Sequence, residues 1–468
     1  MMPQFGKAAR QLGWLWPLVL FACAKNDADR EPILARVGDR AITQKEFLFR
    51  VEFMPPPVFE SVNGRSGKAG LLELLVAEKL MATAAEEAGM DSARFLREQL
   101  ELVRQYAALR ELYKDEVQSK ISLSEAEVAA ALKQSQTRFV IEYFQSRSKT
   151  RAQRERQRWQ SQLSRPPDAD RGDDVRGVEQ EVSWGDMEPA LEQWLYRLQE
   201  GEISPLIRFS QGYAFFHVRK VYHQPLVTQS EIAQRMRRIR KVMRFRKMDS
   251  LSARFVADFM NAKKLVLKHD TFNALAAWLD LMLQYNDEPD IGPGAPPNRE
   301  VILDSMKTAL GRYLDRPLIT YDGGEFSLRD MIRSLRIRNM PFETASPRAM
   351  RKQLMADLKL IARDELLARE ALRRGLDRRP AVQFDVRLWR DYYLSRLYAD
   401  RRQLRLFPEA SGGPQRRVVF PEPLQRLRNE ADVWINQPLL EKLDITGLPM
   451  MAVRPGRIVT LVAPPWPN

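Results

Sequence analysis

The sequence predicts an α+β protein that is predominantly helical. Apolar residues recur at helical spacing over long segments, as with Leu71, Leu74, Leu75 and Leu80. The same order of elements appears a second time near residue 318. Between these helical stretches, residues 136–225 alternate strand-like and helical runs, which is the pattern of a small α+β domain. We therefore expect helical modules flanking a small β-α-β domain.

The first module opens at residues 33–47. A strand over 33–37, a Gly-Asp turn and a second short apolar element lead into a helix that Thr43 caps. Glu46 stands three residues later and predicts a capping box. Helices are expected from Gly70 to Gly89 and from Ser92 to about residue 120, and a further helix is capped near Ser124.

The second module repeats this plan from residue 318, with Ser327 as the hydroxyl cap and Gly375 at the end of its long helix. The offset stays near 285 residues, so an internal duplication is the simplest account, and two generic helical modules with common caps are the alternative. A short strand closes each half, at 265–268 and at 433–436. We expect each closing strand to pair back onto its own module. Prolines and glycines mark a linker at 286–299.

Composition excludes several classes of function. The 468 residues carry 75 Lys and Arg against 61 Asp and Glu, and the excess is mostly Arg on helical stretches such as 235–241, which is typical of solvated helix faces. No zinc spacing, RNP pattern or phosphate loop accompanies it, so no nucleic-acid partner is expected. A single cysteine, Cys23, and three histidines give no basis for a disulfide, a metal site or a cofactor.

The first 23 residues predict export and lipid attachment. Lys7 and Arg10 precede an apolar run over 12–21 that is too short to span a bilayer, as in a secretory signal peptide. The run ends at Leu20-Phe21-Ala22-Cys23, which resembles a lipobox and implies lipidation of Cys23 after cleavage. An ordinary signal peptide with an incidental cysteine is the alternative. Ala24 would favour the outer membrane if the cell is Gram-negative.

Residues 187–218 carry a resemblance to a known family. Leu198-Gln199-Glu200-Gly201-Glu202-Ile203-Ser204 and Gly212-Tyr213-Ala214-Phe215-Phe216 resemble the Leu-x-x-Gly-Glu-Ile-Ser and Gly-Tyr-His runs of the parvulin (PpiC-like) peptidyl-prolyl isomerases. The opening Val37-Gly38-Asp39 with Ile42-Thr43 resembles the N-terminal module of SurA/PrsA/PpiD-type envelope chaperones. The two resemblances together cover most of the mature chain.

The departures from the family fall in the active site that the resemblance implies. Glu142 or Tyr143 stands where parvulins carry a histidine in the first strand, and Ala214 replaces the histidine after Gly-Tyr. His217 is an odd number of residues from Ala214 and should point to the opposite face of the strand. The resemblance thus implies a degenerate parvulin site, made of these residues: Tyr143, Met187, Leu191, Trp194, Phe209, Ala214 and Phe215.

The resemblance implies the following order along the chain: a lipoprotein signal peptide (1–23), a SurA-N-like helical module (24–135), a parvulin-like domain (136–225), a helical extension that completes the first module (226–285), the linker (286–299) and a second helical module without an insert (300–468).

The favoured function is an envelope folding factor that binds unfolded or nascent envelope proteins and is held at the membrane by a lipid anchor, with an inactive isomerase domain. Two alternatives stay open. An active prolyl isomerase would catalyse exchange in a short proline peptide. A structural lipoprotein subunit would bind one folded partner at fixed stoichiometry.

Overall fold

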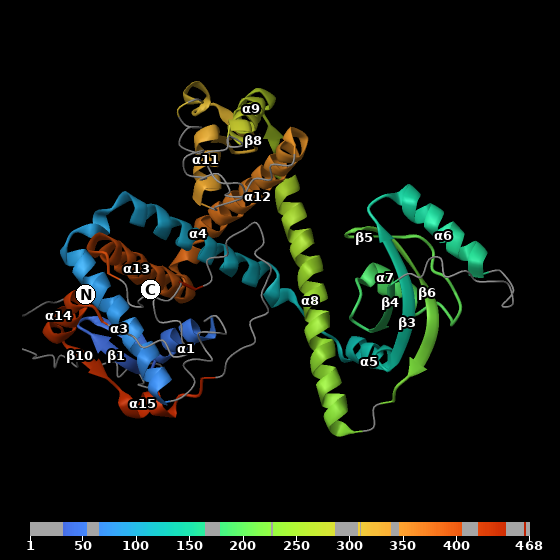
Figure 1. Cartoon of the computed structure of the whole chain (residues 1–468), viewed down its shortest axis with the longest axis horizontal. Coiled ribbons are helices and arrows are strands. Elements are labelled where there is room, and N and C mark those ends of the chain that lie inside the picture. Colours follow the sequence, from blue (N-terminus) through green and yellow to red (C-terminus); the bar gives the residue numbers. More distant parts are fainter. Residues whose placement is uncertain are drawn as a thin grey trace, which may run out of the picture. The chain divides into compact units, whose positions relative to one another are not determined.

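A computed structural model describes residues 31–53, 65–163, 178–225, 228–285, 308, 310–337, 346–404, 420–445 and 463–464. The fold is α+β and predominantly helical, as predicted, with three small antiparallel sheets. The described residues group into two compact units, one within Met1–Ala107 and Asp377–Asn468, and the other within Ala108–Leu376 (Figure 1). None of the described helices is long and apolar enough to cross a membrane.

The first unit combines elements from both ends of the sequence. It contains β1 (Ile33–Val37), β2 (Arg40–Thr43), α1 (Gln44–Glu52), α3 (Arg65–Glu87) and the first part of α4 (Arg94–Glu116). From the other end come α13 (Pro380–Arg402), α14 (Glu422–Glu430), β10 (Val433–Ile435) and α15 (Gln437–Lys442). The apolar face predicted on α3 is buried in a core that also holds Leu394 and Tyr398 of α13 and Leu424 of α14.

Thr43 begins α1 as predicted. Its side chain accepts a hydrogen bond from the Glu46 backbone N–H at 3.1 Å. The Glu46 carboxylate, however, lies 2.6 Å from the Lys79 ammonium, so it forms a buried ion pair where a capping box was expected. At Ser124, which caps α5 (Glu125–Gln134), both bonds of a capping box with Glu127 are present.

The second unit contains the second sheet module. Its strands β8 (Pro317–Tyr321) and β9 (Gly324–Ser327) are followed by α11 (Leu328–Ile337) and α12 (Pro347–Arg373). The helix α8 (Gln229–Asn261), the strand β7 (Val266–Leu267) and α9 (His269–Tyr285) precede them in the chain, and Phe272, Leu275 and Leu279 of α9 enter the same core as Leu318 and Phe326.

The two closing strands form as predicted, but the partners predicted for them are wrong. β10 pairs antiparallel with β1, with Trp434 opposite Arg36, and Figure 1 shows the red β10 beside the blue β1. β7 pairs antiparallel with β8, with Val266 opposite Thr320. Each half of the chain therefore supplies the strand that completes the other half's sheet. Residues 226–285 do not complete the first module, because β7 pairs with β8 and α9 buries its apolar residues in the same core as β8 and α11.

Residues 136–225 form the predicted small α+β fold. β3 (Thr137–Ser146), α6 (Lys149–Leu163), β4 (Val178–Ser183), α7 (Pro189–Leu195), β5 (Ile207–Phe209) and β6 (Gly212–His223) follow in order, and the antiparallel sheet runs β4-β3-β6-β5. One face of the sheet packs against α7 through Phe139, Ile141 and Phe216. On the other face, Phe215 contacts Trp159 of α6 with ring centroids 5.0 Å apart.

Candidate functional site

The alternation of side chains along β3 and β6 builds one side of a cleft. Ile141, Tyr143 and Gln145 are two residues apart on β3 and share a face of the sheet. Ala214 pairs with Gln145 on the neighbouring strand β6. These side chains line a cleft of about 350 Å³ on the face that α7 partly covers.

Apolar side chains from two other segments close the cleft. Met187 and Leu191 come from the start of α7 and the turn before it, and Phe209 comes from β5. Leu191 is 8% exposed, whereas Met187 and Phe209 are half-buried and open to the cleft. The cleft therefore offers apolar surface to a ligand without any movement of the backbone.

Gly212 sets the position of Phe209 relative to β6. Phe209 pairs with Gly212, so Ser210 and Gln211 form a two-residue hairpin turn. Gly212 has a φ of +135°, and a Cβ atom there would lie 2.6 Å from the Ser146 carbonyl oxygen. Only glycine fits this close approach to the end of β3, which explains the glycine of the Gly-Tyr motif.

The carboxylates at the rim of the cleft already have partners. Glu188 accepts hydrogen bonds from the backbone N–H of Ser210, at 3.1 Å, and from its hydroxyl. Asp186 accepts from the Ser183 N–H at 2.8 Å and from Arg238 at 2.6 Å. These contacts hold the turns on either side of α7, so neither carboxylate is placed as a general base.

Six of the seven predicted site residues converge as expected. Tyr143, Met187, Leu191, Phe209, Ala214 and Phe215 line the cleft. The ring of Phe215 also contacts Phe144 and Trp159 of α6. Trp194 is half-buried beside the core of this domain, with Arg197 over its ring, and it does not line the cleft.

His217 lies on the face opposite Ala214, as the sequence predicts. It pairs with Glu142 across β3 and β6, and its Nδ1 is 3.4 Å from a Glu142 carboxylate oxygen. Its side chain is buried at this position. None of the described residues that line the cleft is a histidine, so the cleft holds apolar, amide, carboxylate and phenol groups but no imidazole.

Three glutamines of the cleft were not predicted from the sequence. Gln145, Gln180 and Gln211 lie at its rim, on β3, β4 and the β5–β6 turn. The period-two rule would have found Gln145, because it shares a face with Tyr143. Gln180 faces the cleft only because β4 pairs with β3 in this register, with Gln180 opposite Ile141, and nothing local in the sequence fixes that register.

Other predicted sites add no chemistry here. Cys23 lies outside the described residues. Within the described part of the chain, no group of three or more His, Cys, Asp and Glu side chains is placed to hold a metal ion.

No family model matches this chain, and no curated protein matches it. Among solved structures, a SurA-like chaperone of Campylobacter jejuni is 12% identical over 51% of this chain and 100% of its own, with a TM-score of 0.22. The peptidylprolyl isomerase PrsA of Bacillus cereus is 15% identical over 45% of this chain and 82% of its own, with a TM-score of 0.20. PrsA of Bacillus anthracis is 12% identical, covering 39% and 96%, with a TM-score of 0.21.

Proposed function

We propose that this protein is an envelope folding factor that holds unfolded polypeptide, and that its parvulin-like domain binds peptide without isomerising proline. One observation carries the proposal. The cleft keeps the apolar residues Met187, Leu191 and Phe209. Glu142 or Tyr143, and Ala214, stand where the resemblance places two histidines.

The cleft suits a ligand of variable sequence. An unfolded chain exposes apolar side chains and unpaired backbone groups. Met187 and Phe209 can cover an apolar side chain, and the flexible thioether of Met tolerates different shapes. A glutamine side chain both donates and accepts hydrogen bonds, so Gln145, Gln180 and Gln211 can pair with either backbone group of a peptide.

The same cleft is poorly equipped for isomerisation. Rotation about a prolyl peptide bond must cross a barrier of about 18–20 kcal/mol, because the twisted amide loses its resonance. A catalyst has to bind the twisted form better than the planar form. Apolar surface holds both forms alike. In place of two imidazoles the cleft has the phenol of Tyr143 and the apolar methyl group of Ala214.

The test uses the chain without residues 1–23. Exchange NMR on a short proline peptide measures catalysis, and light scattering of an unfolded outer-membrane-type protein measures suppression of aggregation. We expect suppression without catalysis. Catalysis would instead establish the active isomerase, and the absence of both activities would favour a structural subunit with one folded partner.

Phe209→Ala ties the activity to the cleft. Loss of a large apolar contact should weaken peptide binding by about tenfold, because burial of a Phe side chain contributes about 1.5–3 kcal/mol. Phe245→Ala is the matched control, since Phe245 is an exposed phenylalanine on α8 that does not line the cleft. Equal binding by the two variants would show that clients bind elsewhere.

We also propose that Cys23 carries the lipid that holds the protein at the membrane, as the lipobox-like sequence implies. Metabolic labelling with an alkyne fatty acid tests this proposal. The full-length chain should be labelled and should sediment with membranes, and Cys23→Ser should lose both properties. A full-length chain that is neither labelled nor sedimented would point to an ordinary signal peptide, and a Cys23→Ser protein that still sediments would point to another mode of attachment.

A further inference from the structure

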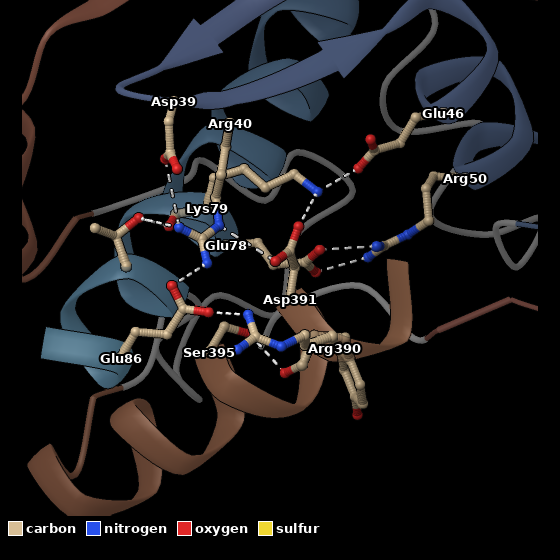
Figure 2. A network of polar contacts seen from close by, with 12 residues as sticks. Asp39, Arg40, Glu46, Arg50, Glu78, Lys79, Glu86, Arg390, Asp391 and Ser395 are labelled. Atoms are coloured by element: carbon tan, nitrogen blue, oxygen red, sulfur yellow. Dashed lines mark hydrogen bonds and ion pairs between the residues drawn. The ribbon is translucent and has the colours of Figure 1, made fainter. Parts of the chain in front are cut away.

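A buried network of charges joins the two halves of the chain inside the first unit. The ammonium of Lys79 on α3 lies 2.6 Å from a Glu46 carboxylate oxygen and 2.7 Å from an Asp391 carboxylate oxygen (Figure 2). The Lys79 side chain is 3% exposed. Glu46 and Lys79 come from the first half of the chain, whereas Asp391 lies on α13 of the second half.

Further ion pairs extend the network on both sides. Arg40 donates to Asp391 at 3.3 Å, to Glu86 at 2.6 Å and to the Thr83 hydroxyl at 2.8 Å. Arg390, next to Asp391 on α13, also pairs with Glu86. Figure 2 shows these side chains converging from β2, α3 and α13. Removing one partner from such a buried ion pair destabilises the fold, because the charge that remains is neither neutralised by its partner nor solvated by water.

The two halves can be compared position by position. Gly89 and Gly375 both adopt left-handed φ angles, 69° and 71°, at the ends of α3 and α12, and they are 286 positions apart. α4 and α13 each have 23 residues and begin 286 positions apart. With this offset, the counterpart of Lys79 on α12 is Glu365, and the counterpart of Asp391 on α4 is Gln105.

These counterparts distinguish two ways of assembling the halves. In the observed arrangement α3 receives α13, and Lys79 meets Asp391. The end of α4 packs on α12 through Leu109, Leu112 and Leu367. If each half closed on itself, α3 would receive α4 and α12 would receive α13. Lys79 would then face the neutral Gln105, and Asp391 would face Glu365, a carboxylate of the same charge.

We propose that Asp391 and its counterparts are specificity-determining residues, which make α3 a docking surface for the second half of the chain and reject the first half. The apolar residues of the two repeats are similar and fit either arrangement: Leu72 and Leu358, Leu75 and Ile361, Leu80 and Leu366, Ala85 and Ala371. The buried charges are not interchangeable, so they decide which closing segment completes which sheet.

Engineered disulfides in the full-length chain report the arrangement. Arg36 is opposite Trp434 on β10, and Val266 on β7 holds the corresponding place opposite Thr320. In a Cys23→Ser background, Arg36→Cys with Trp434→Cys reports the exchanged pairing, and Arg36→Cys with Val266→Cys reports the self-closed pairing. Residues directly opposite on antiparallel strands are near enough for a disulfide.

Two pairs of charge changes test the proposal. With the natural charges, the exchanged disulfide should exceed the self-closed one by about tenfold or more. Gln105→Asp with Asp391→Gln moves the carboxylate to α4 and should invert the ratio. Gln105→Asp with Glu365→Lys makes both arrangements complementary and removes no partner from Lys79, so it should bring the ratio close to one.

The second pair of changes keeps the test decisive if the first prevents folding. A folded Gln105→Asp, Glu365→Lys protein that retains the natural ratio of disulfides would overturn the proposal, and apolar packing would then be what selects the arrangement. A ratio near one, or an inverted ratio in the first variant, would support it.

Discussion

Phe215 borders the cleft and also packs on the opposite face of the sheet. Its neighbours Ala214 and Phe216 enter the core that borders the cleft, while Phe215 turns to the other face of β6 and lies between Phe144 and Trp159. Period-two alternation separates these residues, and the same rule placed His217 correctly. The resemblance to parvulins places Phe215 in the site, and only the alternation along β6 indicates which face of the sheet its ring contacts.

We predict that Phe215→Ala destabilises the small domain by about 3–5 kcal/mol, because the fully buried ring leaves a cavity that its neighbours fill only in part. Urea unfolding followed by Trp fluorescence measures the loss. Phe245→Ala, which removes an exposed ring, should change the stability far less. If both variants were equally stable, Phe215 would have to be exposed or mobile.

The ion pairs of Glu370 with Arg373 and Arg374 on α12 are expected to be sensitive to acid. Hydrogen bonds from Arg373 and Arg374 lower the pKa of Glu370 to about 2, although partial burial opposes the shift. A carboxylate with a lowered pKa stabilises the fold above its unfolded pKa and loses that contribution as the pH falls. Glu370→Gln should therefore be less stable than the natural chain at pH 7, and the difference in urea midpoint should shrink between about pH 4.5 and 2.

The control for this contact is Glu325→Gln, since Glu325 is exposed and forms no ion pair with any of the described side chains. Its effect on the urea midpoint should not follow the same course with pH. A difference between Glu370→Gln and the natural chain that stays constant down to pH 2 would contradict the assignment.

Among the elements, the β5–β6 hairpin gives the sharpest prediction. Gly212→Ala would place a Cβ atom 2.6 Å from the Ser146 carbonyl oxygen, at a φ that L-residues rarely adopt. Gly201→Ala is the matched control, because Gly201 also has a positive φ, +87°, but open space around it. We expect Gly201→Ala to cost about 1–2 kcal/mol from backbone strain alone and Gly212→Ala to cost more. Thermal unfolding of the two variants measures the difference.

The elements themselves were largely predictable from local signals. Thr43 and Ser124 cap helices because their hydroxyls accept from backbone N–H groups two or three residues on. The order of strands and helices in 136–225 also follows from the sequence. What could not be predicted were the partners. The register that brings Gln180 to the cleft and the ion pair that draws Glu46 from its cap to Lys79 depend on residues distant in the chain.

At the scale of the whole molecule, the similarity of the two halves explains why their pairing was predicted wrongly. Two similar halves offer two similar sets of apolar surface, so the hydrophobic pattern alone favours neither arrangement. Position in the sequence then assigns each closing strand to the half in which it occurs. The buried charges break this degeneracy, but they do so through contacts between residues about 310 positions apart, such as Lys79 and Asp391. Sequence periodicity carries no information about such contacts.

The exchange makes a prediction that separates the two sheets. Trp434 lies opposite Arg36 in β1, and the Asn436 N–H, two residues further on, donates to the Leu34 carbonyl at 2.8 Å. Val266 lies opposite Thr320 in β8, and the Lys268 N–H, two residues further on, donates to the Leu318 carbonyl at 2.9 Å. Alternate residues of a strand direct their N–H groups to the same side, so the N–H groups of Trp434 and Val266 face β1 and β8. Proline at these positions removes the donor and disturbs the pairing. Trp434→Pro should therefore speed amide hydrogen exchange in β1, and Val266→Pro should speed it in β8.

Each variant is the control for the other, because each strand change should leave the sheet of its own half protected. Mass spectrometry of the peptides that contain residues 33–37 and 317–321 reads both sheets in one experiment. If Val266→Pro released β1 and Trp434→Pro released β8, each half would close on itself and the exchange would be wrong. The exchanged result would mean that β1 has to wait for β10, which comes from the other end of the sequence. The sheet of the first half is then completed only after the second half has been synthesised.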